Sequence, residues 1–203
     1  MITKAQIRRM IWDKLEREGI AAFPRPCHGR IPNFVGNREA TMRLLELEEF
    51  QRARCIFCAP DHALRAARDL VLAQGKVLAA ATPHMKSFVE LRGRVSTSIR
   101  GLIKHGRPLR TPVDLIVQGS VAVDLKGNRL GKGKGYGDRE IAYLKERGLA
   151  RPDVKVVTIV HDAQIVDDLS ALVTEEDVPV DYILTPTRCI PTSGSTDRQR
   201  ISG

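Results

Sequence analysis

The strongest chemical signal in the sequence is a glycine- and lysine-rich stretch, GNRLGKGKGYGD, which runs from Gly127 to Asp138. From Gly131 to Gly137, glycines alternate with larger residues, two of which are lysines. Glycines at such a turn let backbone N–H groups approach an anion closely, and the N-terminus of a following helix adds its dipole. Lysines supply mobile positive charge for phosphate oxygens. The stretch therefore predicts a phosphate-binding loop.

The loop departs from two common nucleotide-binding patterns. It lacks the G-K-[ST] ending of a Walker A loop, and its G-x-G-x-G spacing lacks the last step of the Rossmann fingerprint. A basic turn without a ligand therefore remains an alternative. Asp138 also has two open interpretations, as the N-cap of the next helix or as a ligand for a metal ion beside the phosphates.

A second pair of cations lies near the start of the chain. Lys4 and Arg8 are four residues apart, so they share one face of a helix. Lys4 is in line with Ile11 and Leu15 on the apolar side, and it occupies the first turn, where the helix dipole disfavours a cation. A lysine there is unfavourable unless an anion or a carboxylate meets it. A lysine that extends its charged end back to water is the alternative.

The charge balance predicts an anionic partner. The 203 residues carry a formal net charge of +9, which suits a nucleotide, a nucleic acid or a polyglutamylated cofactor. The candidates for an RNA-binding surface are Arg65, Arg68, Arg92, Arg94, Arg100, Lys104 and Arg107. Because no aromatic residues are interleaved with them, a solvated basic face is the favoured interpretation and RNA binding is not.

Length and composition favour one α/β domain over residues 1–191, followed by a disordered Ser/Gly/Arg-rich tail, Thr192–Gly203. Aromatic residues make up only 4% of the chain, so the core must be aliphatic, as in a buried parallel sheet. No apolar run is long enough for a membrane helix, and the charged first residues are not a signal peptide. We expect a cytoplasmic protein that does not bind membranes.

The cysteine pattern argues against a metal or redox site. Cys55 and Cys58 stand in an apolar run, and no second pair or histidine lies at zinc-ligand spacing. On a strand, residues three apart point to opposite faces. We expect buried apolar cysteines.

Apolar periodicity and turn residues predict the elements that position the loop. We expect helices at 3–18, 40–50, 61–74 and 138–147, and strands at 54–59, 76–82, 113–124, 154–161 and 180–186. A Pro/Gly-rich connector covers 23–39, and 88–110 has no clear assignment. This alternation predicts a three-layer α/β fold, a mostly parallel sheet with helices on both faces. The glycine loop should lie at the C-terminal edge of strand 113–124 and near the first helix.

Several segments resemble one enzyme family. GNRLGKGKGYGD is similar to the GNRLGRGKGYYD-like loop of 5-formyltetrahydrofolate cyclo-ligases, also called methenyltetrahydrofolate synthetases. Lys4 and Arg8 look like that family's phosphate-contacting first helix, and Asp177–Asp181 resembles its closing stretch. The resemblance is closest to the methenyltetrahydrofolate synthetase domain-containing branch. The segments similar to that branch are Phe23–Phe34, Val113–Val123, Val156–Asp162 and Val180–Arg188.

The resemblance implies an enzyme that uses ATP and Mg²⁺ to convert 5-formyltetrahydrofolate, a reduced folate, into 5,10-methenyltetrahydrofolate. It implies that ATP phosphorylates the formyl oxygen, that N10 attacks the activated carbon, and that phosphate leaves as the ring closes. The residues that would hold ATP are Lys4, Arg8, Arg129, Gly131, Lys132, Gly133, Lys134, Gly135, Tyr136 and Gly137. Asp138 and Asp177 would hold magnesium.

Two departures from the family pattern affect the folate side of the site. The second tyrosine of the GYYD loop is Gly137 here, which removes an aromatic wall for the pterin. The family's substrate-pocket glutamate is absent after the strand at Ile56–Ala59, where Asp61 is the nearest carboxylate. A non-catalytic nucleotide- or RNA-binding relative that retains the fold is therefore the alternative function.

Overall fold

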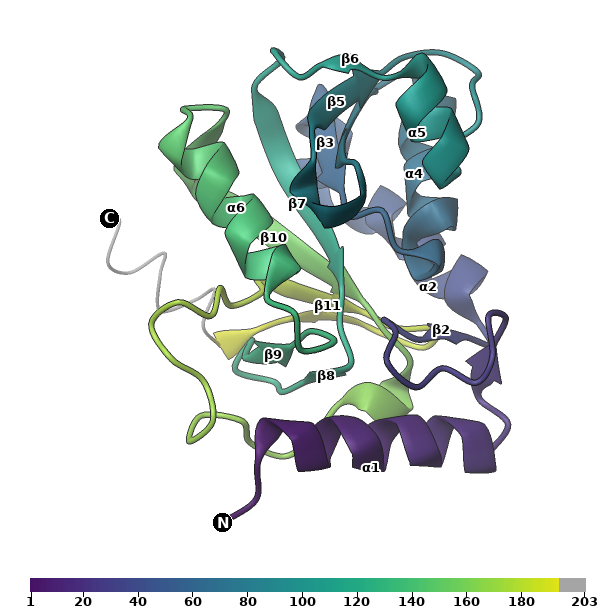
Figure 1. Ribbon diagram of the computed structural model, residues 1–203, viewed down its shortest axis with the longest axis vertical. Coiled ribbons are helices and arrows are strands. Elements are labelled where there is room, and N and C mark those ends of the chain that lie inside the picture. Colours follow the sequence, from purple (N-terminus) through teal and green to yellow (C-terminus); the bar gives the residue numbers. More distant parts are fainter. Residues whose placement is uncertain (194–203) are drawn as a thin grey trace.

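A computed structural model describes residues 1–193, and Figure 1 shows a twisted sheet with helices packed on both sides. The strands of the main sheet are β3 (Cys55–Cys58), β4 (Val77–Ala81), β5 (Phe88–Leu91), β6 (Arg107–Pro108), β7 (Val113–Gly119), β10 (Ala150–Ile159), β11 (Tyr182–Leu184) and β12 (Cys189–Pro191). Their order is β12-β11-β10-β7-β3-β4-β5-β6. The pairs from β11 to β4 are parallel, and the pairs at the two edges are antiparallel. The predicted mostly parallel sheet is confirmed.

The central strands are apolar on both faces because helices cover both faces. All four residues of β3 are buried. Cys58 packs in the cluster with Phe50 and Leu64, whereas Cys55 packs in the cluster with Ile141 and Leu144. The two cysteines therefore face opposite sides of the sheet, as the spacing predicts. Burial raises the pKa of both thiols to about 12, which suits packing and not thiolate chemistry.

The helices divide between the two faces as a three-layer fold requires. They are α1 (Lys4–Arg17), α2 (Asn37–Met42), α3 (Glu48–Arg52), α4 (Arg65–Ala73), α5 (Ile99–His105) and α6 (Tyr136–Glu146), with 3-10 turns η1 (Arg43–Glu46), η2 (His62–Leu64), η3 (Pro83–Met85) and η4 (Asp162–Gln164). α6 covers one face, α2 to α5 cover the other, and α1 crosses one end of the molecule (Figure 1). The predicted layers are confirmed.

The first helix begins where the sequence places it. The hydroxyl of Thr3 accepts a hydrogen bond from the Gln6 N–H at 3.1 Å, and the Gln6 side chain accepts one from the Thr3 N–H at 2.8 Å. This capping box satisfies two backbone donors that a helix start leaves unpaired. Ile11 and Leu15 then bury the apolar side of α1, which fixes the direction of Lys4 and Arg8.

Strand 113–124 was predicted to be continuous, but β7 ends at Gly119. The chain bends there and forms a small hairpin, β8 (Ala122–Val123) with β9 (Arg129–Leu130). A Cβ atom at Gly119 would lie 2.3 Å from the Ile31 side chain, so the close approach of Ile31 favours glycine at this position. Ile31 belongs to the Pro/Gly-rich connector, which also forms a small pair, β1 (Ala21–Ala22) with β2 (Asn33–Phe34).

Other predicted bounds also differ. The expected helix 40–50 is α2, η1 and α3, and the unassigned segment 88–110 holds β5, α5 and β6. The predicted tail overlaps the described residues at 192–193, where Thr192 is buried and its hydroxyl donates to the Val180 carbonyl at 2.8 Å; the remainder of the tail lies outside the described residues. Within 1–193, no helix is long and apolar enough to cross a membrane.

Candidate functional site

The β8–β9 hairpin carries the glycine loop back over the end of β7. The Asp124 carboxylate closes the hairpin turn by accepting from the backbone N–H groups of Lys126 at 3.0 Å and Asn128 at 2.9 Å. The loop and the end of β7, Gln118 and Gly119, then line one pocket of about 600 Å³. The glycine loop therefore lies at the C-terminal edge of the sheet, as predicted, although the strand ends earlier.

Most residues predicted for the site line this pocket. They are Lys4, Arg8, Arg129, Gly131, Lys132, Gly133, Gly135, Tyr136, Gly137, Asp138 and Asp177. Lys134 is the exception, because it is exposed and does not line the pocket. Its backbone carbonyl accepts a hydrogen bond from Arg139 at 2.9 Å.

Arg8 joins the first helix to the glycine loop. Its Nε donates to the Gly131 carbonyl at 2.7 Å. The guanidinium also lies against Gly133, where an added Cβ would be 3.3 Å from Nη1, and the φ of +108° there disfavours any residue other than glycine. The loop therefore follows the surface of α1, and contact between these two segments is as expected.

Lys4 meets a carboxylate, as its position on the apolar side of the helix requires. Its Nζ lies 3.0 Å from Oδ2 of Asp177. The same oxygen accepts from the backbone N–H of Thr174 at 2.7 Å. Burial alone would raise the pKa of Asp177, but the Thr174 N–H and the Lys4 ammonium lower it below its ordinary value. Asp177 is therefore a fixed anion at the edge of the pocket.

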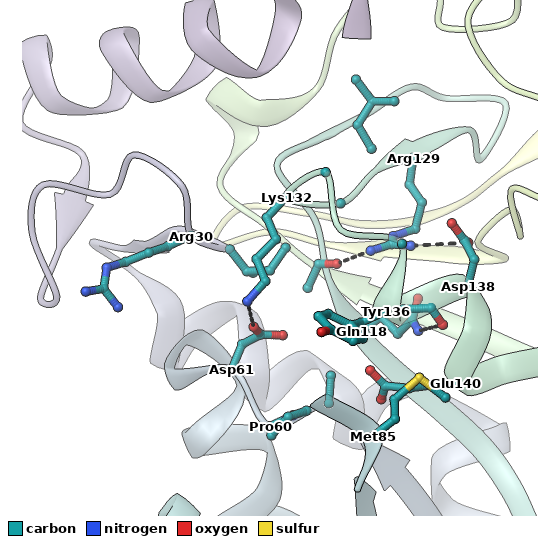
Figure 2. Close-up of a pocket in the computed structure, with 18 of the residues that line it drawn as sticks. Arg30, Pro60, Asp61, Met85, Gln118, Arg129, Lys132, Tyr136, Asp138 and Glu140 are labelled. Carbon is teal, nitrogen blue, oxygen red and sulfur yellow. Dashed lines mark hydrogen bonds and ion pairs between the residues drawn. The ribbon is translucent and has the colours of Figure 1, made fainter. Parts of the chain in front are cut away.

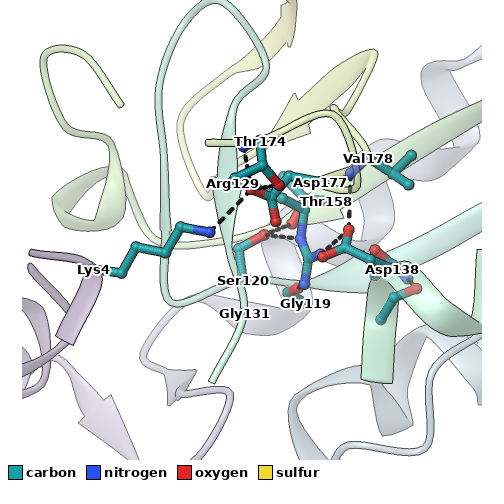
Figure 3. A network of polar contacts seen from close by, with 12 residues as sticks. Lys4, Gly119, Ser120, Arg129, Gly131, Asp138, Thr158, Thr174, Asp177 and Val178 are labelled. Carbon is teal, nitrogen blue, oxygen red and sulfur yellow. Dashed lines mark hydrogen bonds and ion pairs between the residues drawn. The ribbon is translucent and has the colours of Figure 1, made fainter. Parts of the chain in front are cut away.

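Arg129 lies behind the glycine loop and is only 6% exposed. It donates to the Gly119 carbonyl at 2.9 Å and to the Ser120 hydroxyl at 3.3 Å, and its Nη1 lies 3.5 Å from Oδ1 of Asp138 (Figure 3). Much of its hydrogen-bonding capacity is used inside the protein. It supports the pocket wall as well as lining the pocket.

Asp138 is not the N-cap of the following helix. α6 begins at Tyr136, and its N-cap is Gly135, with a φ of +71°. Asp138 lies in the first turn, where its Oδ1 accepts from the backbone N–H of Val178 at 2.9 Å. Burial raises its pKa, and Asp177 adds to the rise. Because Val178 follows Asp177, this bond brings the two carboxylates together (Figure 3).

The carboxylates do not form a dense metal cluster. Among residues 1–193, no three His, Cys, Asp or Glu side chains come together as a metal-binding group. Asp138 and Asp177 each use one carboxylate oxygen, Oδ1 and Oδ2 respectively, in contacts with other described residues. That arrangement fits Mg²⁺, which takes one or two carboxylates together with phosphate oxygens and waters.

The space beside Gly137 is occupied. A Cβ there would lie 3.2 Å from both terminal nitrogens of Arg129 and from Nε2 of Gln118. The Gly137 carbonyl in turn accepts from Gln118 Nε2 at 2.8 Å. The glycine that replaces the family's tyrosine therefore makes room for two polar side chains.

Glu140 is a pocket residue that the sequence interpretation missed. It is 4% exposed, and its Oε2 has no hydrogen-bond partner among the described residues. Burial, and the neighbouring Asp61 charge, raise its pKa to about 8. Figure 2 shows it on the pocket side of α6. Its place one turn before the buried Leu144 was the available signal, because a carboxylate on an apolar helix face needs a reason.

The turn between β4 and β5 forms another wall of the pocket, and the sequence interpretation did not predict it. His84 and Met85 have positive φ angles of 60° and 55°, which is uncommon for non-glycine residues. The His84 Nδ1 lies 2.9 Å from the Tyr136 hydroxyl. This contact ties the turn to the first residue of α6 and closes the pocket on that side.

His161 and Arg68 have structural roles. His161 does not line the pocket, and its Nδ1 accepts from the Ala163 N–H at 3.0 Å. Arg68 is 1% exposed and donates to the Ala59 and Asp61 carbonyls, both at 2.8 Å. It therefore does not belong to a basic surface, and it holds the chain after β3 in place.

Comparison with known proteins supports the family resemblance that was found in the sequence. The model of the 5-formyltetrahydrofolate cyclo-ligase family matches residues 1–186. The methenyltetrahydrofolate synthase domain-containing proteins of Mus musculus and Homo sapiens are 43% and 41% identical, each over 94% of this chain. The match covers 55% and 54% of those proteins, so the chain spans about half their length.

Solved structures with a similar fold are 5,10-methenyltetrahydrofolate synthetases. The Aquifex aeolicus protein superimposes with a TM-score of 0.62 at 21% identity, covering 94% of this chain and 93% of that one. The Mycoplasma pneumoniae protein gives 0.56 at 14% identity, covering 91% and 99%. These likenesses establish the fold. The family model's match over residues 1–186 confirms the resemblance in the sequence: this chain belongs to the 5-formyltetrahydrofolate cyclo-ligase family.

Proposed function

We propose that this protein binds ATP with Mg²⁺ in the pocket between α1 and the glycine loop, and converts 5-formyltetrahydrofolate into 5,10-methenyltetrahydrofolate. The observation that carries the proposal is the convergence on one pocket of α1, the glycine loop and the Asp177 loop. Family membership supports a ligase. The four cysteines, none of them in a disulfide, suit a reducing compartment such as the cytoplasm.

The proposed phosphate contacts come from cations that now pair with carboxylates. Lys4 pairs with Asp177 at 3.0 Å, and Lys132 lies 3.8 Å from Asp61 (Figure 2). A bound triphosphate offers the lysines a more highly charged partner, and backbone N–H groups of the glycine loop add further donors. Lys134 lies outside the pocket, so we assign it no direct phosphate contact.

The proposed magnesium ligands are Asp138 and Asp177. When bound, the ion would neutralise phosphate charge during transfer. The chain's own part is to hold the two carboxylates together, which the Val178 N–H does by binding Asp138 at 2.9 Å. Arg129, 3.5 Å from Asp138, keeps this pair from being an uncompensated negative cluster.

Phosphoryl transfer to the formyl oxygen needs positioning and charge stabilisation more than a protein nucleophile. A pocket of about 600 Å³ lined by both cations and carboxylates suits that task. His84, Met85 and Tyr136 form the wall where the second substrate would lie. We therefore assign the phosphates to the side of the pocket between α1 and the first turn of α6, and the folate to the side near the His84–Met85 turn.

A non-catalytic nucleotide-binding relative is the second candidate, and Gly137, in place of the family's tyrosine, is the observation that favours it. A turnover assay separates the two. Protein, ATP, Mg²⁺ and 5-formyltetrahydrofolate are mixed, and methenyl product is followed by absorbance, with ATP or Mg²⁺ omitted in turn. Product that requires both supports the cyclo-ligase. Measured ATP binding without product would support the non-catalytic relative.

A further inference from the structure

The acidic side chains of the pocket differ in whether a cation is paired with them. Asp61, Asp138, Glu140 and Asp177 all line it. Three of them have a cationic partner: Lys132 for Asp61, Arg129 for Asp138 and Lys4 for Asp177. Within residues 1–193, no ion pair or hydrogen bond engages the Glu140 side chain, and its Oε2 is buried without a partner.

Gln118 presents a second buried acceptor in the same wall. Its Oε1 has no partner in the part of the chain that the structure describes, and the residue is 1% exposed. The Gly137 carbonyl can only accept, so the Gln118 amide nitrogen must face it, at 2.8 Å. The orientation of the amide is thereby fixed, and Oε1 is left without a donor.

The two acceptors are held close to each other. Gln118 is anchored at Gly137, and Glu140 follows three residues later in α6. Nε2 of Gln118 lies 3.2 Å from where a Cβ of Gly137 would be, so the Gln118 amide occupies the place of a side chain on the helix face that Glu140 shares. Buried oxygens without donors are destabilising, so a pair of them at one pocket wall indicates a ligand that supplies N–H groups.

We propose that Glu140 and Gln118 recognise the 2-amino-4-oxo edge of a pterin ring, with Oε2 of Glu140 and Oε1 of Gln118 accepting from the ring's amino group and N3–H. This inference rests on the proposed reduced-folate function and names the residues that read the substrate. Figure 2 shows Glu140 with Tyr136 and Met85 at this part of the pocket. Glu140 thus supplies a pocket glutamate from α6, although none follows β3.

The edge of the ring decides between ligands. A 2-amino-4-oxo ring presents two adjacent donors, which can satisfy both oxygens. The amino group of adenine presents one N–H on each edge, beside N1 or N7, which are acceptors, so two oxygens on the same edge could not both be paired. Phosphate oxygens are acceptors and cannot serve either atom. The carboxyl of Glu140 keeps an acceptor oxygen whether or not its other oxygen carries a proton.

Direct binding tests this assignment without requiring turnover. Calorimetry would compare pterin, lumazine and ATP–Mg on wild type, Glu140→Leu, Glu140→Gln and Glu146→Gln. Lumazine carries a carbonyl in place of the 2-amino group, and Glu146 is exposed on the same helix, so each is a matched control. Thermal melting of every variant would verify folding.

We expect wild type to bind pterin at least about tenfold more tightly than lumazine, and Glu140→Leu to lose about tenfold or more for pterin. Glu140→Gln, which retains an oxygen acceptor, should lose less, and Glu146→Gln should match wild type. ATP–Mg affinity should stay within about twofold in all four, since none of the residues assigned to phosphate or magnesium is replaced.

The outcomes separate this inference from the proposed function. Equal pterin affinity in wild type and Glu140→Leu, or no preference for pterin over lumazine, would overturn the role of Glu140 even if turnover is observed. Failure of the wild-type protein to bind either pterin or lumazine would also overturn the role of Glu140. Pterin binding that depends on Glu140 without any turnover would support the inference and count against the cyclo-ligase reaction.

Discussion

The Lys4 ammonium lies 3.0 Å from the Asp177 carboxylate, and this ion pair joins the first turn of α1 to a loop 173 residues further along the chain. The side chains are 31% and 19% exposed, so the pair contributes little to stability, roughly 1 kcal/mol or less. It nevertheless places a cation and an anion at the same side of the pocket. In the proposed function this ion pair breaks when ATP and Mg²⁺ bind. Lys4 then contacts phosphate, and Asp177 binds the magnesium ion.

Replacing Arg129 with alanine should destabilise the fold strongly. The buried guanidinium donates to Gly119 and Ser120 and lies 3.5 Å from Asp138. Its loss leaves a half-buried carboxylate without its counterion, a kind of change that costs about 3–5 kcal/mol. Urea unfolding would measure the effect. Exposed Arg9, replaced by alanine, should change the free energy of unfolding by less than about 0.5 kcal/mol; similar values for the two variants would refute the buried role.

Glu140 should make stability fall as pH rises. Its pKa is raised to about 8 in the folded protein from an ordinary value of 4.5. Below pH 4.5 both states are protonated; between 4.5 and about 8 the unfolded state releases a proton that the folded state keeps. Wild type should therefore lose stability relative to Glu140→Gln across this range, and then level off.

At about 1.4 kcal/mol per pKa unit, the full difference is on the order of a few kcal/mol. Urea unfolding of the ligand-free proteins at several pH values would measure it. The variant removes the titrating group, so the comparison isolates Glu140 from Asp61, Arg129 and Lys132, whose charges act on it. A difference that is constant from pH 5 to 8 would contradict a raised pKa.

Asp138→Asn should weaken ATP binding in the presence of Mg²⁺ more than in its absence. The amide oxygen can still accept from Val178, but the charge that would bind the metal is gone. A moderate loss of stability is also expected, because Arg129 loses its counterion at 3.5 Å. Calorimetric titration with ATP, with and without Mg²⁺, would measure the first effect. If the variant merely melts earlier and binds ATP–Mg normally, Asp138 is structural and the metal assignment is wrong.

The parts predicted from sequence depend on strong local patterns. The apolar run around Cys55 and Cys58 predicted a strand buried on both faces, and apolar periodicity predicted the helix at 3–18 that is α1. The glycine stretch predicted a loop before a helix at the sheet edge. Lys4, a cation on the apolar side of a helix, predicted a charged partner, and that partner is Asp177.

The parts that were missed depend on tertiary contacts. β7 ends at Gly119, and the residue that packs against this glycine is Ile31, which is distant in sequence. The N-cap of α6 is Gly135 and not Asp138, whose carboxylate instead accepts from the backbone N–H of Val178, 40 residues further along the chain. Glu140 carries the same helix-face signal as Lys4, but whether its oxygen finds a donor depends on neighbours that the local sequence does not specify.

The most direct test is calorimetric titration of ATP–Mg into wild type, Arg8→Ala and Lys4→Ala, with Arg9→Ala and Lys134→Ala as controls. Each pocket cation should contribute a charged hydrogen bond of about 1.5–3 kcal/mol, so each loss should weaken binding about tenfold or more. Arg9 is exposed and Lys134 does not line the pocket, so both controls should stay within about threefold of wild type. Equal affinities for all five proteins, or no ATP binding by wild type, would contradict an ATP site between α1 and the glycine loop.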